Sequence, residues 1–274
     1  MTSSVEASPR QAVWKPDLLT VVAIAIVAYA LANVAHEAVG HGGACLLVGG
    51  KPLALLSIGF DCDESTLTDG GRRIVAAGGT LMNLLLGSLA LLGLLARRRS
   101  AHGRWFLWLL ATINLFQAAG YFLFSGIANV GDWAVVVGGL RPTLAWRTAL
   151  VVVGGIAYVG VAWAAAGWLA PLVGAQGRIA RARRLAVPSY LTGGLLYCVS
   201  SLFNPVGLEF VLISAGASSF AATSGFLWFQ QWLRGDRIPP SSEAIVLDRR
   251  RSWLVSGVVT ALVFIGLLGP GIRF

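Results

Sequence analysis

Residues 18–48 read LLTVVAIAIVAYALANVAHEAVGHGGACLLV, a long run that is uncharged as far as Ala35 and then carries His36, Glu37 and His41. A bilayer core about 30 Å thick needs roughly 20 mainly apolar residues in a helix. The run continues well past the small residues near Ala28, so a cleaved signal peptide does not account for it. We therefore expect a retained first membrane span.

The rest of the chain has the same character. Of its 274 residues, 56% are hydrophobic and only 12% are charged, whereas a soluble domain carries about 25% charged residues. This composition excludes a soluble enzyme, a coiled coil and a disordered chain. Lipid offers the backbone no hydrogen bonds, and the runs lack the alternation of a barrel. The sequence thus predicts an all-α, polytopic membrane helical bundle.

Uncharged runs divide the chain into about seven transmembrane helices. They are Leu18 to Ala35 (continuing to Val48), Ile74 to Ala96, Trp105 to Gly131, Thr148 to Gly177, Leu185 to Leu208, Phe210 to Leu233 and Ser252 to Ile272. With the amino terminus in the cytoplasm, 15 of the 21 basic residues lie on the inner side, as the positive-inside rule favours. We expect a multi-pass protein of the cell membrane, and the net charge of +9 reflects orientation rather than nucleic-acid binding.

The segments outside the spans carry weaker signals. Residues 1–16 are predicted to be a disordered cytoplasmic tail and residues 17–274 the membrane domain. The segment from Gly49 to Arg73 alternates apolar and polar residues, so it forms either a short hairpin at the membrane surface or a solvated connector. Three cysteines at unrelated spacings predict no disulfide framework.

Ionisable residues inside spans are costly and mark function by default. Here they are His36, Glu37, His41, Asp132 and Glu209, all at a similar depth in the predicted topology. Two histidines near one another on a helix can share a zinc ion, and the adjacent glutamate can act as general base. The alternative is a polar cluster of two histidines and a glutamate at a helix end.

The spacing HExxGH separates the two histidines by five residues rather than the four of HExxH. At about 100° per residue, residue i+5 of an α-helix points roughly 140° away from residue i. A π-bulge absorbs one extra residue and is frequent at functional sites. We therefore expect local unwinding near Gly40 if both rings bind one metal.

Three stretches resemble the site-2 protease family of intramembrane zinc metalloproteases. They are HEAVGHGGA at 36–44, AAGGTLMNLLLG at 76–87 and NVGDW at 129–133. The resemblance implies a three-helix protease-like core over residues 18–140, with additional spans over 141–274. The soluble dipeptidyl peptidase III family uses the same HExxGH spacing for zinc.

The resemblance also implies roles for residues. It gives His36, His41 and Asp132 as zinc ligands and Glu37 as general base. Glu209 is the alternative third ligand, because a glutamate from a later helix is a common third ligand in other zinc proteases. The resemblance suggests Asn83 and Asn129 as substrate-binding residues, and it places an edge strand that holds the substrate extended in the segment from Lys51 to Arg72.

These observations predict an intramembrane zinc metalloprotease that hydrolyses peptide bonds of membrane-embedded substrates. Its partners would be a membrane-protein substrate and the lipid bilayer, with no nucleic acid; the oligomeric state is not predicted. The alternatives are a membrane metal transporter and a catalytically inactive, protease-like binding protein.

Overall fold

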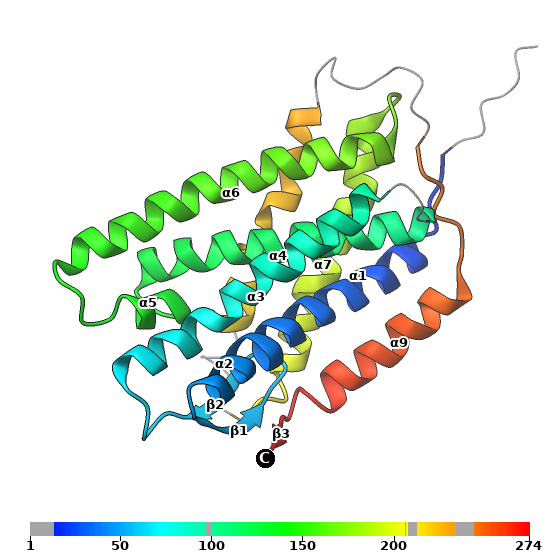
Figure 1. Cartoon of the computed structure of the whole chain (residues 1–274). Coiled ribbons are helices and arrows are strands. Elements are labelled where there is room, and N and C mark those ends of the chain that lie inside the picture. The colour runs from blue at the N-terminus through cyan, green and yellow to red at the C-terminus, as the bar shows by residue number, and fades with distance from the viewer. Residues whose placement is uncertain (1–13, 97–99, 206, 208–212, 234–243) are drawn as a thin grey trace, which may run out of the picture.

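The computed structural model describes residues 14–96, 100–205, 207, 213–233 and 244–274, and over these residues the chain is a mainly helical bundle (Figure 1). In chain order the elements are α1 (Leu18–Val34), η1 (Ala35–His41), α2 (Gly42–Leu47), β1 (Lys51–Leu55), β2 (Phe60–Asp63), α3 (Asp69–Leu95), α4 (Ala101–Ala128), α5 (Asp132–Val136), α6 (Thr143–Val173), α7 (Arg178–Ser201), η2 (Ala217–Ala221), η3 (Ser224–Leu227), η4 (Phe229–Leu233), α9 (Arg251–Gly266) and β3 (Ile272–Arg273).

Four helices in the described residues are long and apolar enough to cross a membrane. They are Leu18–Leu47, Asp69–Leu95, Ala101–Ala128 and Thr143–Val173. They coincide with the first four predicted spans, which supports the prediction of a helical membrane protein. Of the remaining helices, α7 begins with several arginines, and α9 is a shorter apolar helix of 16 residues. A total of seven spans stays a prediction.

The predicted span from Phe210 to Leu233 differs from a continuous helix over its described part. Residues 217–221 are π-helical, and residues 224–227 and 229–233 form 3-10 turns. Irregular backbone at membrane depth is tolerated where protein surrounds it or where it lines a cavity. Here the Tyr158 hydroxyl accepts a hydrogen bond from the Gly225 backbone N–H at 2.9 Å, so a neighbouring helix supplies the partner.

The π-helical segment η1 packs against α3 through glycines. A Cβ on Gly40 would lie 2.6 Å from the Gly79 Cα and 2.8 Å from the Gly78 carbonyl oxygen. Backbones approach this closely only where neither helix carries a side chain. The small-residue run near residue 78 therefore serves to bring α3 against the two histidines.

A small sheet covers one end of the bundle, where Figure 1 also places α2 and α5. Its strand order is β2-β1-β3, and β1 pairs antiparallel with both neighbours. The Asn33 side chain of α1 donates a hydrogen bond to the Ser57 carbonyl in the hairpin turn. Of the two alternatives for this segment, the hairpin is confirmed.

A disulfide joins Cys45 of α2 to Cys62 of β2. The prediction of no disulfide framework was wrong, because the hairpin folds back over the first span and brings together two cysteines 17 residues apart. The spacing of the cysteines along the chain does not predict that contact. The bond ties α2, which directly follows the histidine-bearing segment η1, to the sheet.

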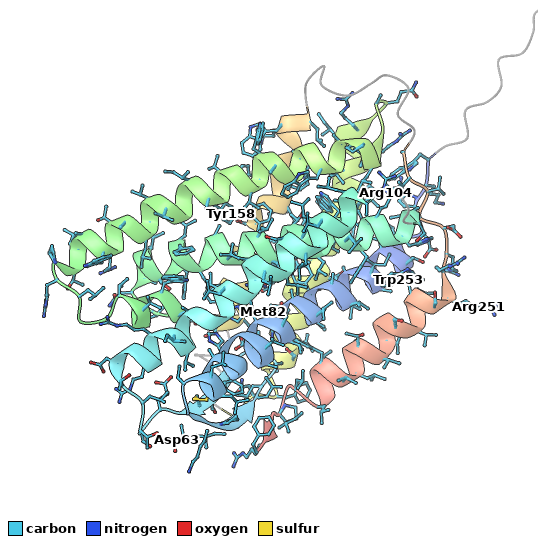
Figure 2. All side chains as sticks on the ribbon, in the orientation of Figure 1. Asp63, Met82, Arg104, Tyr158, Arg251 and Trp253 are labelled. Carbon is cyan, nitrogen blue, oxygen red and sulfur yellow. A yellow bond between two sulfur atoms is a disulfide. The ribbon has the colours of Figure 1, made fainter. Side chains whose placement is uncertain are left out.

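The opposite end of the bundle gathers basic residues. Figure 2 shows Arg104 and Arg251 near that end and Asp63 at the sheet end. The Trp14 indole donates to the Ile245 carbonyl at 2.9 Å, and the Arg181 guanidinium lies 5.4 Å from its ring centroid. Trp14 is thus packed on the bundle, whereas residues 1–13 of the predicted tail lie outside the described residues.

Candidate metal centre

The π-helical turn brings His36 and His41 together. Their Nε2 atoms lie 3.1 Å apart, and the two rings meet at 82° with centroids 4.7 Å apart. A π-helix bonds residue i to i+5 and so places the sixth residue over the first. The local unwinding expected from the HExxGH spacing is confirmed, since residues 35–41 are π-helical.

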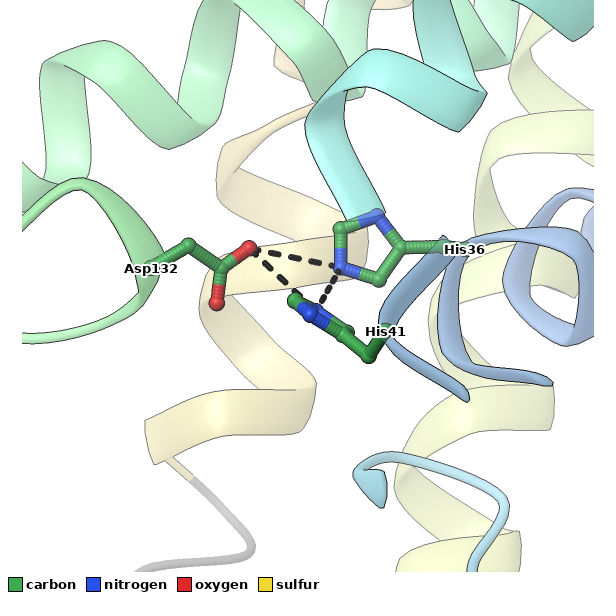
Figure 3. Close-up of side chains that lie close together, drawn as sticks. All are labelled: His36, His41 and Asp132. Atoms are coloured by element: carbon green, nitrogen blue, oxygen red, sulfur yellow. Dashed lines mark hydrogen bonds and ion pairs between the residues drawn. The ribbon is translucent and has the colours of Figure 1, made fainter. Parts of the chain in front are cut away.

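Asp132 completes the group from α5. Its Oδ2 atom lies 3.5 Å from the Nε2 atom of His36 and 3.5 Å from that of His41 (Figure 3). Three tetrahedral ligands about 2.0–2.1 Å from a zinc ion lie roughly 3.3–3.4 Å from one another. The three facing atoms form a triangle of this size, so the group could hold a metal ion.

The ionisation state of Asp132 suits such a role. Burial alone would raise the pKa of its carboxyl, but the two adjacent imidazoles outweigh burial and hold the pKa well below its usual value. The Oδ2 atom is buried and accepts no hydrogen bond from the described residues. An ionised, buried oxygen that faces two ring nitrogens without a hydrogen bond is an unsatisfied acceptor that a cation would complete.

Contacts behind the histidines fix their rings. The Nδ1 atom of His41 lies 2.8 Å from the Val75 carbonyl oxygen; the carbonyl can only accept, so Nδ1 carries the proton and Nε2 keeps its lone pair for a ligand. The His36 ring stacks on Tyr121 at a centroid distance of 4.7 Å and an angle of 16°. Both Nε2 atoms are therefore held toward Asp132.

The residues on either side of Asp132 hold its segment of the chain in place. Gly131 has a φ of 82°, a left-handed conformation that favours glycine, and it precedes the first residue of α5. The next residue, Trp133, donates from its backbone to the Ser125 hydroxyl at 3.2 Å and from its indole to the Thr80 hydroxyl at 3.0 Å. Trp133 also stacks on Phe122 at 4.3 Å, so α5 is anchored to α3 and α4.

Glu37 lies beside the same group. It is 4% exposed, and its Oε2 atom lies 4.0 Å from the His41 Nε2 atom. Gly59, in the hairpin turn, lines the same cavity as Glu37. A carboxylate at this distance is next to the ligand triangle without being one of its corners.

A cavity of about 350 Å³ opens onto these side chains. Its apolar wall comes from the hairpin, α3, α4, α5 and the segment 214–222, with the residues Ile58, Phe60, Cys62, Val75, Ala76, Tyr121, Phe124, Val135, Ala217 and Ala222. Ser214, Ser218 and Glu64 add polar groups. Sequence reasoning missed Tyr121 and the two serines, because aromatic and hydroxyl residues inside an apolar span carry no periodic signal.

Asn83 and Asn129 are not among the residues that line this cavity. Asn83 is fully buried in α3, and neither polar atom of its side chain has a hydrogen-bond partner among the residues described. Asn129 is exposed and ends α4 in a left-handed conformation with a φ of 58°. Glu209, the alternative third ligand, lies outside the described residues. The substrate-binding roles of Asn83 and Asn129 stay predictions.

Comparisons with protein-family models, with curated proteins and with solved structures found no match for this chain. The fold and the site define the class only as far as a helical membrane protein with a His-His-Asp group that could bind a metal.

Proposed function

We propose that this protein is an intramembrane zinc metalloprotease, similar to site-2 proteases, that hydrolyses peptide bonds of membrane-embedded substrates. The observation that carries the proposal is the His36, His41 and Asp132 triangle with Glu37 beside it, facing an apolar cavity in a membrane helix bundle. Isolated ionisable groups at this depth are costly, so their convergence on one point favours a catalytic site.

The donor set favours zinc as the metal. Two imidazoles and one carboxylate are a frequent ligand set of catalytic zinc, which keeps its fourth position open. When bound here, zinc would polarise a carbonyl oxygen and lower the pKa of a water molecule. His36, His41 and Asp132 all line the cavity, so a substrate carbonyl in the cavity could reach the ion.

Glu37 would move the proton in this reaction. Its carboxylate takes a proton as the water oxygen forms a bond to the scissile carbonyl carbon, and the carbonyl π electrons pass to the carbonyl oxygen. That electron pair then re-forms the carbonyl as the C–N bond breaks, and the leaving nitrogen takes the proton from Glu37. The products are one carboxylic acid and one amine, which balances the added water.

The β2 strand is the surface that would hold a substrate extended. Its neighbour β1 is paired on both sides, whereas β2 pairs with β1 alone among the described strands. Phe60 and Cys62 of β2 line the cavity beside Glu37. A peptide that adds to this open edge would gain main-chain hydrogen bonds and lose its helical shielding.

The proposed orientation places the amino terminus in the cytoplasm. The described part of the basic end carries Arg104, Arg178, Arg181 and Arg251, while the sheet end carries the Cys45–Cys62 disulfide. Basic residues favour the inner side of a membrane and disulfides persist on the oxidising side. Both preferences favour a cell-membrane protein whose cavity opens toward the outer side.

A Glu37→Gln variant tests the proposal. With the purified full-length chain in detergent and a single-span model peptide as substrate, we expect wild-type cleavage, at least 100-fold slower cleavage by the variant and about one zinc ion per chain in both. Asp69→Asn, an exposed acid at the start of α3, is the matched control and should cleave normally.

Other outcomes separate the alternatives. Normal cleavage by Glu37→Gln would contradict the protease proposal. Zinc binding with no hydrolysis by the wild type would favour the inactive binding protein, and zinc flux into liposomes that depends on His36 would favour the metal transporter.

A further inference from the structure

The chain has five tyrosines, and four of them use their hydroxyl groups to complete the bundle. Tyr29 pairs with the Thr223 hydroxyl at 3.0 Å and Tyr158 with the Ser224 hydroxyl at 3.0 Å, whereas Tyr190 donates to the Phe220 carbonyl at 3.2 Å and Tyr197 to the Tyr29 carbonyl at 2.9 Å. A buried tyrosine hydroxyl normally finds such a partner.

Tyr121 is the exception. Its ring lies over His36, but its hydroxyl makes no hydrogen bond to any residue that the structure describes. Tyr121 lines the cavity, and its hydroxyl is not among the polar atoms that are sealed in protein without a partner. The hydroxyl is therefore available to whatever enters the cavity.

Two contacts bear on the position of Tyr121. The His36 ring stacks on its ring. The preceding residue, Gly120, lets α4 approach the segment after η2, because a Cβ there would lie 3.0 Å from the Ala222 Cβ. A phenol hydroxyl can donate a hydrogen bond toward an oxygen that develops negative charge.

We propose that the Tyr121 hydroxyl is a catalytic hydrogen-bond donor to the carbonyl oxygen of the scissile peptide bond as that oxygen becomes negative. This inference rests on the proposed proteolytic function and adds a residue to it. Tyr121 transfers no proton: its O–H bond stays intact while the carbonyl π electrons move onto the oxygen. A fixed donor of this kind typically contributes about 100-fold to 1000-fold in kcat.

Tyr121→Phe tests the hydroxyl alone, because phenylalanine keeps the ring that stacks on His36. We expect kcat for the model peptide to fall by about 100-fold to 1000-fold, with KM changed less than about 3-fold and zinc content unchanged. Tyr190→Phe removes a hydroxyl that bonds the Phe220 carbonyl outside the cavity wall and is the matched control; its kcat should stay within about 2-fold of wild type.

A binding measurement gives a readout that does not need turnover. The probes are a phosphinic pseudopeptide, which carries the charge and shape of the reacting carbon, and the same sequence with an uncleavable ground-state backbone. We expect Tyr121→Phe to weaken binding of the phosphinic probe at least 10-fold and that of the ground-state probe less than 3-fold. Equal losses for both probes, or no loss for either, would overturn the assignment.

The two proposals fail separately. If Glu37→Gln abolishes cleavage while Tyr121→Phe matches wild type in kcat and in phosphinic affinity, the protease proposal stands and the Tyr121 role is wrong. If the wild type cleaves nothing and binds both probes equally, the protease proposal itself fails and the Tyr121 assignment fails with it.

Discussion

At the scale of single residues, the metal centre depends on the absence of a side chain at Gly79. Gly79 of α3 faces the two imidazoles, and a Cβ built there would lie 2.5 Å from the Nε2 atoms of both His36 and His41. These are the atoms that face Asp132. A side chain at position 79 would therefore clash with the two Nε2 atoms. This clash explains why a glycine occupies the position.

Gly79→Ala should therefore displace the rings. We expect at least a 10-fold loss of zinc affinity, measured by competition with a chelator on the purified chain. Gly167→Ala is the matched control, since nothing lies within 4 Å of a Cβ at that position of α6, and it should leave zinc affinity unchanged. Retained affinity in Gly79→Ala would show that the rings do not hold the metal in this geometry.

Trp133 carries a second residue-scale prediction. Its indole N–H donates to the Thr80 hydroxyl while its ring stacks on Phe122, so Trp133→Phe removes the hydrogen bond and keeps an aromatic ring. We expect zinc affinity to fall about 10-fold to 100-fold, as for other supports of metal ligands. Trp146→Phe, on a half-exposed tryptophan of α6, is the control, and an unchanged affinity in Trp133→Phe would contradict this role.

At the scale of elements, the sheet and the first span act as one unit. The disulfide between Cys45 and Cys62 connects α2 to β2, and Cys62 also lines the cavity. A Cβ on Gly50 would lie 2.6 Å from the Cys62 sulfur and 2.9 Å from the Cys45 sulfur, so the turn between α2 and β1 is packed against the bond. The strand proposed to hold a substrate is thereby fixed to the helix that holds the histidines.

Cys45→Ser combined with Cys62→Ser should loosen this unit. A cross-link that closes a loop of this length contributes about 3 kcal/mol, so we expect the Tm of the double variant to fall by several degrees, measured by thermal unfolding in detergent. Cys198→Ser, at the free cysteine of α7, is the control and should change Tm little. An unchanged Tm in the double variant would show that the disulfide does not stabilise the fold.

At the scale of the whole molecule, the sheet, α5 and the metal centre lie at one end of the bundle, and Arg104 and Arg251 lie near the other (Figures 1 and 2). The sheet end also carries basic residues, such as Lys51 of β1 and Arg273 of β3. If basic residues set the orientation, the centre lies nearer the outer side.

Cysteine labelling tests this orientation in intact cells. In a Cys198→Ser background, we expect a membrane-impermeant maleimide to label Thr66→Cys, at an exposed site near the hairpin, without permeabilisation. Gln176→Cys, exposed between α6 and α7, should react only after the membrane is opened. The reverse pattern would overturn the proposed topology.

The sequence by itself determined the helical membrane character, the first four spans, the histidine pair and the need for a π-turn at Gly40. These depend on composition and on local angular spacing, which are properties of the chain alone. Only the tertiary structure brought Asp132 to both histidines, closed the Cys45–Cys62 bond, broke the segment after residue 213 and placed Tyr121 over His36. Each of these depends on which faces of distant elements pack together, and residue spacing does not encode that geometry.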